Sequence, residues 1–318
     1  MIPNIFQGRM TVPVIAAPMF LVSGPRLIIE ACKAGIAGAF PTLNARPADM
    51  LDAWLTEIAV ELNAASAANP RAPIAPYGVN LILHRANARR EEDFARVVKH
   101  NVPLVITSLG HPGEVVKAVH AYGGVVFSDV IHAHHARKAI EAGVDGIVCV
   151  AAGAGGHAGT QNAFSLVREI REFWRGALAL GGAISDGASV RAAEVLGADF
   201  AYIGTRFVAT RESLATDENK QMILDCAAQD IVYTPVITGA HANFLWPSLE
   251  KAGYRKDLLD RADPGQRFDS NAKAWRDVWS AGHGIATIHD IPSTAELAAR
   301  LAAEYRAACA LPPSAALG

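Results

Sequence analysis

The stretch Val144-Asp145-Gly146-Ile147-Val148-Cys149-Val150, followed by Ala151-Ala152-Gly153-Ala154-Gly155-Gly156-His157-Ala158-Gly159-Thr160, decides how the rest of the chain is interpreted. Its first part is a short apolar run without polar alternation, which predicts a strand buried on both faces. The small residues that follow allow a backbone to come close to a ligand. His157 is the one large polar side chain in this loop, and an imidazole at that place indicates proton chemistry beside a bound cofactor.

Seven more apolar runs of this kind alternate with helical patterns along the chain. Eight strands, each followed by a helix, favour a closed parallel (β/α)8 barrel, the TIM-barrel form of the α/β class, over an open doubly wound sheet. Pro and Asp residues at helix starts, such as Pro25, Pro47 and Asp186, support this alternation. The strands are predicted at residues 12–17, 36–40, 77–82, 103–107, 124–128, 144–150, 177–180 and 200–203.

The segment that follows the eighth strand differs in composition from the rest of the chain. Residues 213–284 are richer in polar and aromatic side chains and contain the turn signal Asp263-Pro264-Gly265-Gln266. We interpret them as an insertion that caps the active site. Residues 1–212 and 285–318 then form the barrel, with a last amphipathic helix at 294–309.

Charge and cysteine usage limit the class of partner. The net charge is −2, and no Lys/Arg cluster is interleaved with aromatic residues, so we expect a small-molecule partner and no nucleic acid. The four cysteines are scattered without a Cys-x-x-Cys pair, which indicates free thiols in a reducing compartment, and Cys149 is expected in the core. Without a leader-like start or a long apolar run, the chain is expected to be soluble and cytoplasmic, with no membrane partner.

The loops after the seventh and eighth strands are rich in glycine. In such barrels these two loops commonly hold a phosphate group. Gly181 and Gly182 end the seventh strand, and Gly204 and Thr205 end the eighth, so backbone N–H groups at the helix starts in 180–187 and 203–207, with the Thr205 hydroxyl, would face a phosphorylated ligand. The alternative is that they only make tight turns.

Two other patterns allow a competing interpretation. Residues 153–158 satisfy the dinucleotide pattern G-x-G-x-x-G/A, but the loop continues through Asn162 and the next strand ends in two glycines rather than an acidic residue. His132, His134 and His135 suggest a metal, yet no acid or cysteine completes a tetrahedral set, and a solvated helix start is favoured.

Three further positions are candidates for the site, each with a structural alternative. The Asn80 amide would hydrogen-bond a planar heterocycle or cap a turn. Met19 would line a cofactor ring or fill the core. The run 279–284, Trp-Ser-Ala-Gly-His-Gly, would fold back over the site or form a turn.

Several short pieces, taken in their order and spacing over nearly the whole chain, resemble the nitronate monooxygenase family of FMN-containing barrels. The resemblance implies FMN, with its phosphate at Gly181, Gly182, Gly204 and Thr205 and with Met19, Asn80 and Gly156 beside the cofactor. His157 matches the family's catalytic histidine and Ser280 its active-site serine. The matching pieces are Ala17-Pro18-Met19, Gly78-Val79-Asn80, Gly155 to Gly159, Gly181-Gly182, Gly204 to Phe207, Arg211-Glu212-Ser213 and Trp279 to Gly282.

The implied activity is FMN-dependent oxidation of alkyl nitronates, extending to nitroalkanes, by molecular oxygen to a carbonyl compound and nitrite. Two departures bear on the substrate: Ser128-Asp129 stands where some members carry a lysine, and Gly153-Ala154 is neutral where the family often has an acidic residue. An NAD(P)H-dependent FMN reductase of the enoyl-thioester or quinone type and a non-redox barrel for a phosphorylated metabolite stay open as alternatives. So does the oligomeric state, monomer or homo-oligomer.

Overall fold

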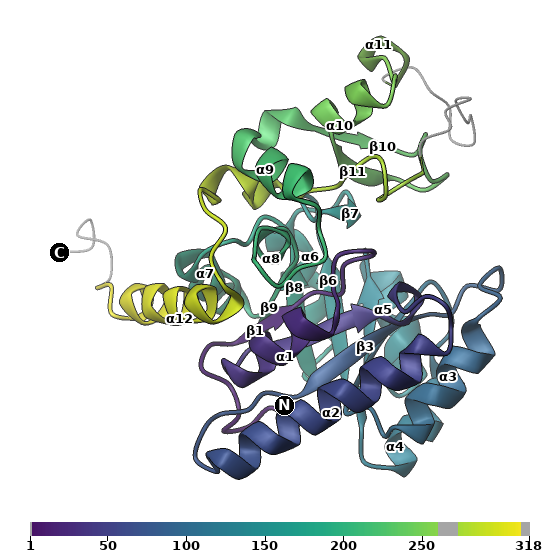
Figure 1. Cartoon of the computed structure of the whole chain (residues 1–318), viewed down its shortest axis with the longest axis vertical. Helices are drawn as coiled ribbons and strands as arrows, with labels where there is room; N and C mark the ends of the chain where they lie inside the picture. The colour runs from purple at the N-terminus through teal and green to yellow at the C-terminus, as the bar shows by residue number, and fades with distance from the viewer. Residues whose placement is uncertain (1, 260–272, 313–318) are drawn as a thin grey trace.

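Eight parallel strands close into a barrel in the computed structural model, which describes residues 2–259 and 273–312 (Figure 1). Each strand pairs in parallel with its neighbours, and β9 returns to β1 to complete the ring. The TIM-barrel prediction is therefore confirmed. The strands are β1 Val14–Ala16, β2 Ala37–Pro41, β3 Tyr77–Ile82, β4 Leu104–Ser108, β5 Val125–Val130, β6 Gly146–Val150, β8 Ala177–Gly181 and β9 Phe200–Ile203.

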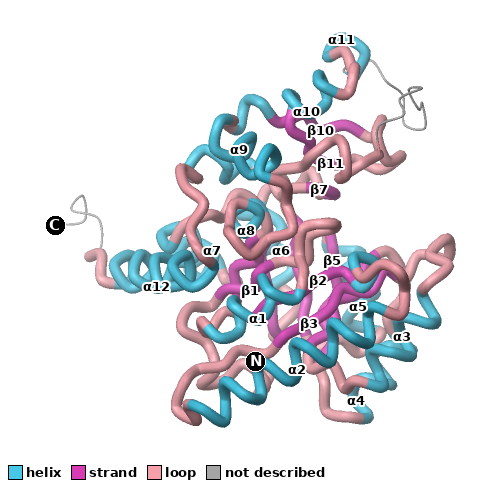
Figure 2. Tube along the Cα trace, viewed as in Figure 1, coloured by secondary structure: helices cyan, strands magenta, loops and turns pink. Residues whose placement is uncertain are grey.

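Helices surround this ring and cover the outward faces of the strands (Figure 2). The C-terminal helix packs against the first and seventh helices and so closes the outer layer. The predicted Asp186 cap and the predicted 294–309 helix are both present. The helices of the outer layer are α1 Pro25–Lys33, α2 Met50–Ala68, α3 Arg90–Lys99, α4 Gly113–Ala121, α5 Ala133–Glu141, α6 Ala163–Arg171, α7 Gly187–Leu196 and α12 Thr294–Cys309, with the short α8 Thr205–Val208 directly after β9 and the 3-10 turn η1 Thr42–Asn44 after β2.

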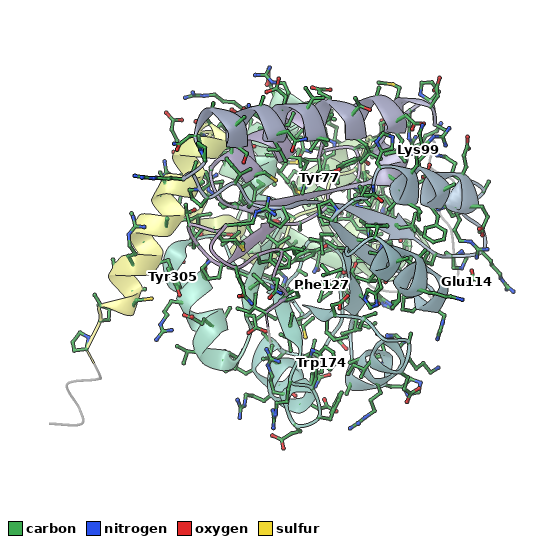
Figure 3. The ribbon with its side chains drawn as sticks, turned by 90° about the horizontal axis from the view of Figure 1, so that it is seen from below. Tyr77, Lys99, Glu114, Phe127, Trp174 and Tyr305 are labelled. Carbon is green, nitrogen blue, oxygen red and sulfur yellow. The ribbon has the colours of Figure 1, made fainter. Side chains whose placement is uncertain are left out.

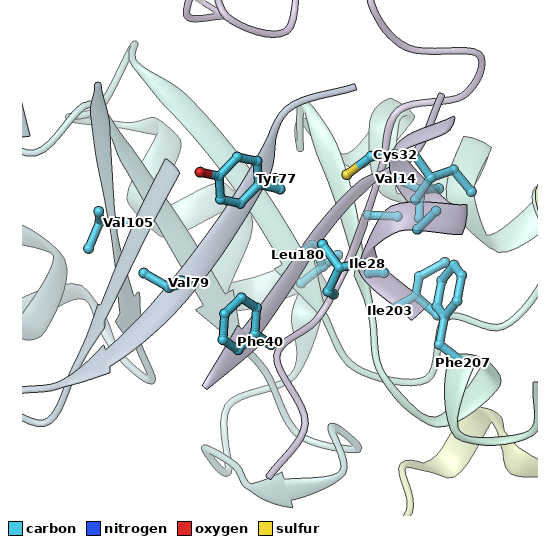
Figure 4. Close-up of a cluster of buried hydrophobic side chains, with 14 of the residues drawn as sticks. Val14, Ile28, Cys32, Phe40, Tyr77, Val79, Val105, Leu180, Ile203 and Phe207 are labelled. Carbon is cyan, nitrogen blue, oxygen red and sulfur yellow. The ribbon is translucent and has the colours of Figure 1, made fainter. Parts of the chain in front are cut away.

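Alternation along each strand creates two hydrophobic layers. One set of side chains, including Phe40 and Val79, points outward and packs under the helices (Figure 4). The other set points inward, and Phe127 lies at the centre of the barrel when it is viewed from below (Figure 3). Phe6 closes this amino-terminal end, with its ring centroid 4.8 Å from that of Phe200 and 5.9 Å from that of Phe127. The opposite, carboxyl-terminal end is the one at which barrels of this kind place their active sites.

The described residues between α8 and α12 lie over that carboxyl-terminal end (Figure 1). Their β10 and β11 form a three-stranded sheet with β7, which is the short strand Gly156–His157 that follows β6. Strand β7 was not predicted, and the predicted turn at 263–266 lies outside the described residues. The division into a barrel and a cap at 213–284 stays a prediction. The elements are α9 Asp217–Asp225, η2 Ala228–Asp230, β10 Ile231–Thr234, β11 Ala242–Leu245, α10 Trp246–Lys251, α11 Lys256–Leu259 and η3 His283–Thr287.

Within the described residues, none of the helices has the length and apolar character needed to cross a membrane.

Candidate functional site

His157 is held at the carboxyl-terminal mouth of the barrel by the sheet above it. In β7, Gly156 pairs with Asn243 and His157 with Ala242, both on β11. The Asn243 Nδ2 group also donates a hydrogen bond to the Ala154 carbonyl at 2.6 Å. Because β11 contacts Ala154, Gly156 and His157, the sheet fixes the backbone of this loop and so determines where the imidazole lies.

The hydrogen bonds around His157 indicate its tautomer. Its Nε2 lies 3.3 Å from the Thr238 Oγ1. The Thr238 hydroxyl donates its single proton to the Ala240 carbonyl at 2.9 Å, so its oxygen accepts from the histidine. We therefore assign the proton to Nε2 and the free lone pair to Nδ1. Desolvation lowers the pKa of His157, which keeps the ring neutral and able to accept a proton at neutral pH.

An aromatic wall, which we define as Phe20, Trp275 and Phe244, stands beside this histidine. The Trp275 ring lies edge-on to His157, with 5.2 Å between their centroids, and also edge-on to Phe20 at 5.9 Å. Phe244, buried in the sheet, lies 6.1 Å from Trp275. Since Phe20 comes from the loop after β1 and Trp275 from the segment before η3, the wall joins the barrel to the segment above it.

The loops after β6, β8 and β9 and the segment around Gly282, just before η3, approach each other so closely that Gly155 and Gly182 have no room for a side chain. The Gly282 N–H donates to Thr205 Oγ1 at 2.8 Å, and a Cβ on Gly155 would lie 2.9 Å from the Gly282 nitrogen. Gly182 has φ +137°, and its Cβ would lie 3.1 Å from the Ala152 carbonyl oxygen. These contacts gather the predicted phosphate residues Gly181, Gly182, Gly204 and Thr205 at one side of the mouth.

One expectation about these loops changes. The start of α7 carries a capping box, in which the Asp186 carboxylate accepts from the Ser189 N–H at 2.7 Å. Glu304 accepts from the Gly187 N–H at 2.8 Å. Because two acidic groups already occupy donors there, the first turn of α7 is not free for a phosphate. The donors expected from residues 180–187 are therefore limited to the loop before Asp186.

The floor of the mouth is polar. Four polar side chains at the ends of strands point inward, because each follows an inward-facing residue by two positions or lies between two outward-facing ones. They belong to Asn80, Ser108, Asp129 and Tyr202. Asn80 Nδ2 donates to Ser108 Oγ at 2.7 Å, and Ser108 Oγ donates to Asp129 Oδ2 at 2.5 Å. Burial raises the pKa of Asp129 to about 6, against the lowering effect of the Ser108 hydrogen bond.

Two buried hydroxyl groups beside the glycine loops lack a partner. The Oγ atoms of Ser185 and Ser280 have no hydrogen-bond partner in the described part of the chain. A Cβ on Gly204 would lie 3.8 Å from Met19 Cγ and Sδ, so Met19 borders the same space. Buried hydroxyls are normally satisfied, which identifies these two as candidates for ligand contacts.

The histidines at 132, 134 and 135 do not form a metal site. Their ring centroids lie 3.7–6.2 Å apart, and the His132 side chain caps α5. Over residues 2–259 and 273–312, no group of three or more His, Cys, Asp or Glu side chains has an arrangement that could hold a metal ion. Cys149 is fully buried, and burial raises its pKa to about 12, as expected for a core thiol.

The residues predicted from the sequence thus lie around one mouth, but some important neighbours were missed. Thr238 and Trp275 approach His157 from far along the chain, without a local motif. Ser108 and Tyr202 carry a signal in the sequence, namely polar side chains on the inward face at a strand's carboxyl end. The direct roles of His157, Ser280, Met19, Asn80 and the glycines stay predictions.

The sequence profile of the nitronate monooxygenase family matches residues 6–304. The nitronate monooxygenase of Neurospora crassa is 27% identical over 307 residues, which cover 85% of this chain and 80% of that protein. A Rhodococcus jostii protein named as a 5-hydroxy-7a-methyl-1-oxo-octahydro-1H-indene-4-carboxyl-CoA dehydrogenase is 26% identical over 260 residues, covering 80% of this chain and 70% of that protein. The solved nitroalkane oxidase from Streptomyces ansochromogenes has a TM-score of 0.76 at 22% identity, covering 96% of this chain and 99% of that chain, and this likeness shows the fold.

Proposed function

The chain belongs to the nitronate monooxygenase family and is a flavin-dependent oxidoreductase, and from this premise we propose that it oxidises alkyl nitronates with FMN and molecular oxygen. The products would be a carbonyl compound and nitrite, and nitroalkanes would be substrates where the enzyme removes their α-proton. The observation that carries the proposal is the neutral His157, held at the mouth with Nδ1 free to accept a proton.

The residues present fit FMN. The unpartnered hydroxyls of Ser185 and Ser280 offer hydrogen bonds, and the open position beside Gly204 offers space for a phosphate-bearing ligand. Gly181, Gly182, Gly204 and Thr205 would hold the phosphate, and Met19, Asn80 and Gly156 would border the ring. Bound there, FMN would supply the electron-accepting chemistry, while the protein supplies orientation and proton transfer.

The chain's own residues then have distinct tasks. His157 takes the α-proton of a nitroalkane at Nδ1 or orients the nitro group of a nitronate, and Thr238 holds the ring in that orientation. The aromatic wall offers an apolar surface to the alkyl group and keeps water from that side. The Ser280 hydroxyl is placed to contact a ligand, because its oxygen has no partner in the described residues.

The visible spectrum of the purified protein, followed by oxygen consumption, tests this proposal. We expect a yellow protein that consumes oxygen when an alkyl nitronate is added and that releases nitrite in proportion. A colourless protein that stays colourless after addition of FMN would contradict the cofactor and favour a non-redox barrel for a phosphorylated metabolite. A yellow protein without nitronate-dependent oxygen uptake would contradict the substrate.

A second candidate is an NAD(P)H-dependent FMN reductase acting on an enoyl thioester or a quinone. The similarity to a carboxyl-CoA dehydrogenase of Rhodococcus jostii supports this second candidate, because that protein's name indicates a thioester substrate. Anaerobic mixing with NADH or NADPH separates the two candidates. Rapid bleaching of the flavin without any nitronate would favour the reductase, and a stable flavin spectrum would favour the oxidase.

The lowered pKa of His157 predicts the pH profile of nitroalkane oxidation. Since desolvation disfavours the imidazolium, the base form persists to lower pH than in a free histidine, whose pKa is about 6.5. We expect kcat/KM to stay constant from pH 8 down to about 6.5 and to fall only below that value. An acidic limb that begins above pH 7 would contradict this assignment, and the limb should be absent from the residual activity of His157→Asn.

The aromatic wall predicts a dependence on substrate size. Replacing Trp275 with alanine removes the ring that faces both His157 and Phe20. We expect KM to rise about tenfold for long or branched nitronates and to change little for the smallest one, because the lost contact is apolar. Trp275→Phe is the matched control and should recover most of the affinity. Equal effects of Trp275→Ala on small and large substrates would show that the wall does not contact the alkyl group.

A further inference from the structure

Asp129 on β5 has a feature that the proposed reaction does not use. Its carboxyl group lies on the floor of the mouth, with Oδ2 bound by Ser108 and with Oδ1 buried and unpartnered in the described residues. A buried carboxyl oxygen without a partner is costly, because its hydration is lost and not replaced. Such an atom at the mouth of a barrel indicates a contact that a ligand completes.

The hydrogen bonds leading to Asp129 have one direction. Asn80 Nδ2 donates to the Ile106 carbonyl at 3.0 Å and to Ser108 Oγ at 2.7 Å, so both its N–H groups are engaged. Ser108 has one proton, and it is donated to Asp129 Oδ2 at 2.5 Å. At one end of this series of hydrogen bonds, the Asn80 side-chain carbonyl oxygen can still accept a hydrogen bond. At the other end, Asp129 Oδ1 is the oxygen without a partner in the described residues.

The surroundings of Asp129 favour its neutral form. Ser108 on β4 bonds its Oδ2 and in turn accepts from Asn80 on β3. Val148 is the register partner of Asp129 on β6, and Tyr202 on β9 lies near enough to interact with its charge. Among them Tyr202 is the group that can ionise, and burial raises its pKa, so it stays protonated. With a pKa of about 6, Asp129 can change protonation near neutral pH, and a neutral acid would donate a hydrogen bond from Oδ1.

We propose that Asp129 is a positioning residue for the flavin, and that its protonation is coupled to the balance between oxidised and reduced FMN bound above the floor. This inference rests on the proposed function. Reduced FMN is more negative than oxidised FMN, so a carboxylate beneath it disfavours the reduced form, whereas a protonated Asp129 supports it. By linkage, reduction of the flavin then draws a proton onto Asp129.

The test compares flavin binding and midpoint potentials in three proteins at pH 8. Asp129→Asn keeps the size of the side chain and removes its charge. We expect its preference for reduced over oxidised FMN to rise about tenfold, which is about 30 mV for a two-electron couple. Asp145→Asn is the matched control, because Asp145 lies at the amino-terminal end of β6 and pairs with His120 at 2.8 Å. Its potential should equal that of the wild type.

The dependence of the potential on pH provides a second readout. We expect the wild type to show a break near pH 6 that Asp129→Asn lacks. Because the Ser108 hydrogen bond lowers the pKa of Asp129, Ser108→Ala should move the break to higher pH, which keeps the inference testable if Asp129→Asn fails to fold. Unchanged potentials in FMN-loaded Asp129→Asn, or the same break in all proteins, would overturn this inference alone. Failure of the wild type to bind FMN would overturn it together with the proposed cofactor.

Discussion

Replacing His157 with asparagine is expected to lower kcat/KM for a nitroalkane by about 10²–10⁴-fold, because the group that accepts the α-proton is removed. The change should leave the fold intact, since β7 pairs with β11 through its backbone and not through the imidazole. Bound FMN should stay at the wild-type level, which the flavin absorbance measures. Oxygen uptake and nitrite release report the loss of turnover.

The two substrate forms separate proton transfer from orientation. A preformed nitronate has already lost its α-proton, so His157→Asn should impair its oxidation much less than that of the parent nitroalkane. His241→Asn is the matched control, because His241 stacks on Tyr233 next to the same sheet, with 4.9 Å between ring centroids, and has no proposed role. Turnover of the nitroalkane by His157→Asn at the wild-type rate would rule out the histidine as the base.

The barrel was predictable because each of its strands carries its own local signal. β3 at 77–82 and α12 at 294–309 have the predicted bounds, since both are long, regular and clearly delimited. β1 is shorter than predicted, from Val14 to Ala16, and its flank contains Pro13, which has no N–H for the ladder. Such errors at strand ends leave the count of strands, and hence the fold, unchanged.

The end of β5 shows why an error at a boundary matters more for the site. The prediction ended this strand at Ser128, whereas the structure continues it to Val130, so Asp129 faces inward instead of lying in a loop. The group that accommodates its carboxyl is Ser108, 21 residues earlier on the neighbouring strand. No local pattern contains that pairing, because hydrophobic periodicity predicts an apolar residue at a buried position.

Long-range pairing also explains what was missed around His157. Its loop becomes strand β7 only because Ala242 and Asn243 lie opposite it, and Thr238 and Trp275 complete its surroundings from the same later part of the chain. A two-residue strand has no periodicity of its own. The sequence therefore located the histidine on the rim of the barrel, and only the fold identified the residues that orient it.

Gly204, in the proposed phosphate site, and Gly155, outside it, predict different effects of a substitution by alanine on stability and on FMN affinity. A Cβ on Gly204 would make only ordinary contacts, 3.8 Å from Met19 Cγ and Sδ and 3.9 Å from the Ala17 Cβ, and the residue has an unremarkable φ of −102°. Gly204→Ala should thus fold as stably as the wild type without FMN. Because the methyl group enters the proposed cradle, FMN affinity should fall about tenfold, the equivalent of about 1.4 kcal/mol of crowding.

Gly155→Ala should behave differently, because its Cβ would lie 2.9 Å from the Gly282 nitrogen and 3.0 Å from the Ala281 carbonyl carbon. These are backbone atoms that cannot rotate away, so the overlap would separate the β6 loop from segment 281–283 and lower the free energy of unfolding of the FMN-free protein by about 1–3 kcal/mol. Thermal unfolding without FMN and titration with FMN measure the two effects independently. If Gly204→Ala binds FMN with wild-type affinity, the cofactor does not lie beside Gly204 and Met19. If its FMN affinity falls while its thermal stability without FMN is unchanged, a ligand beside Gly204 is the explanation.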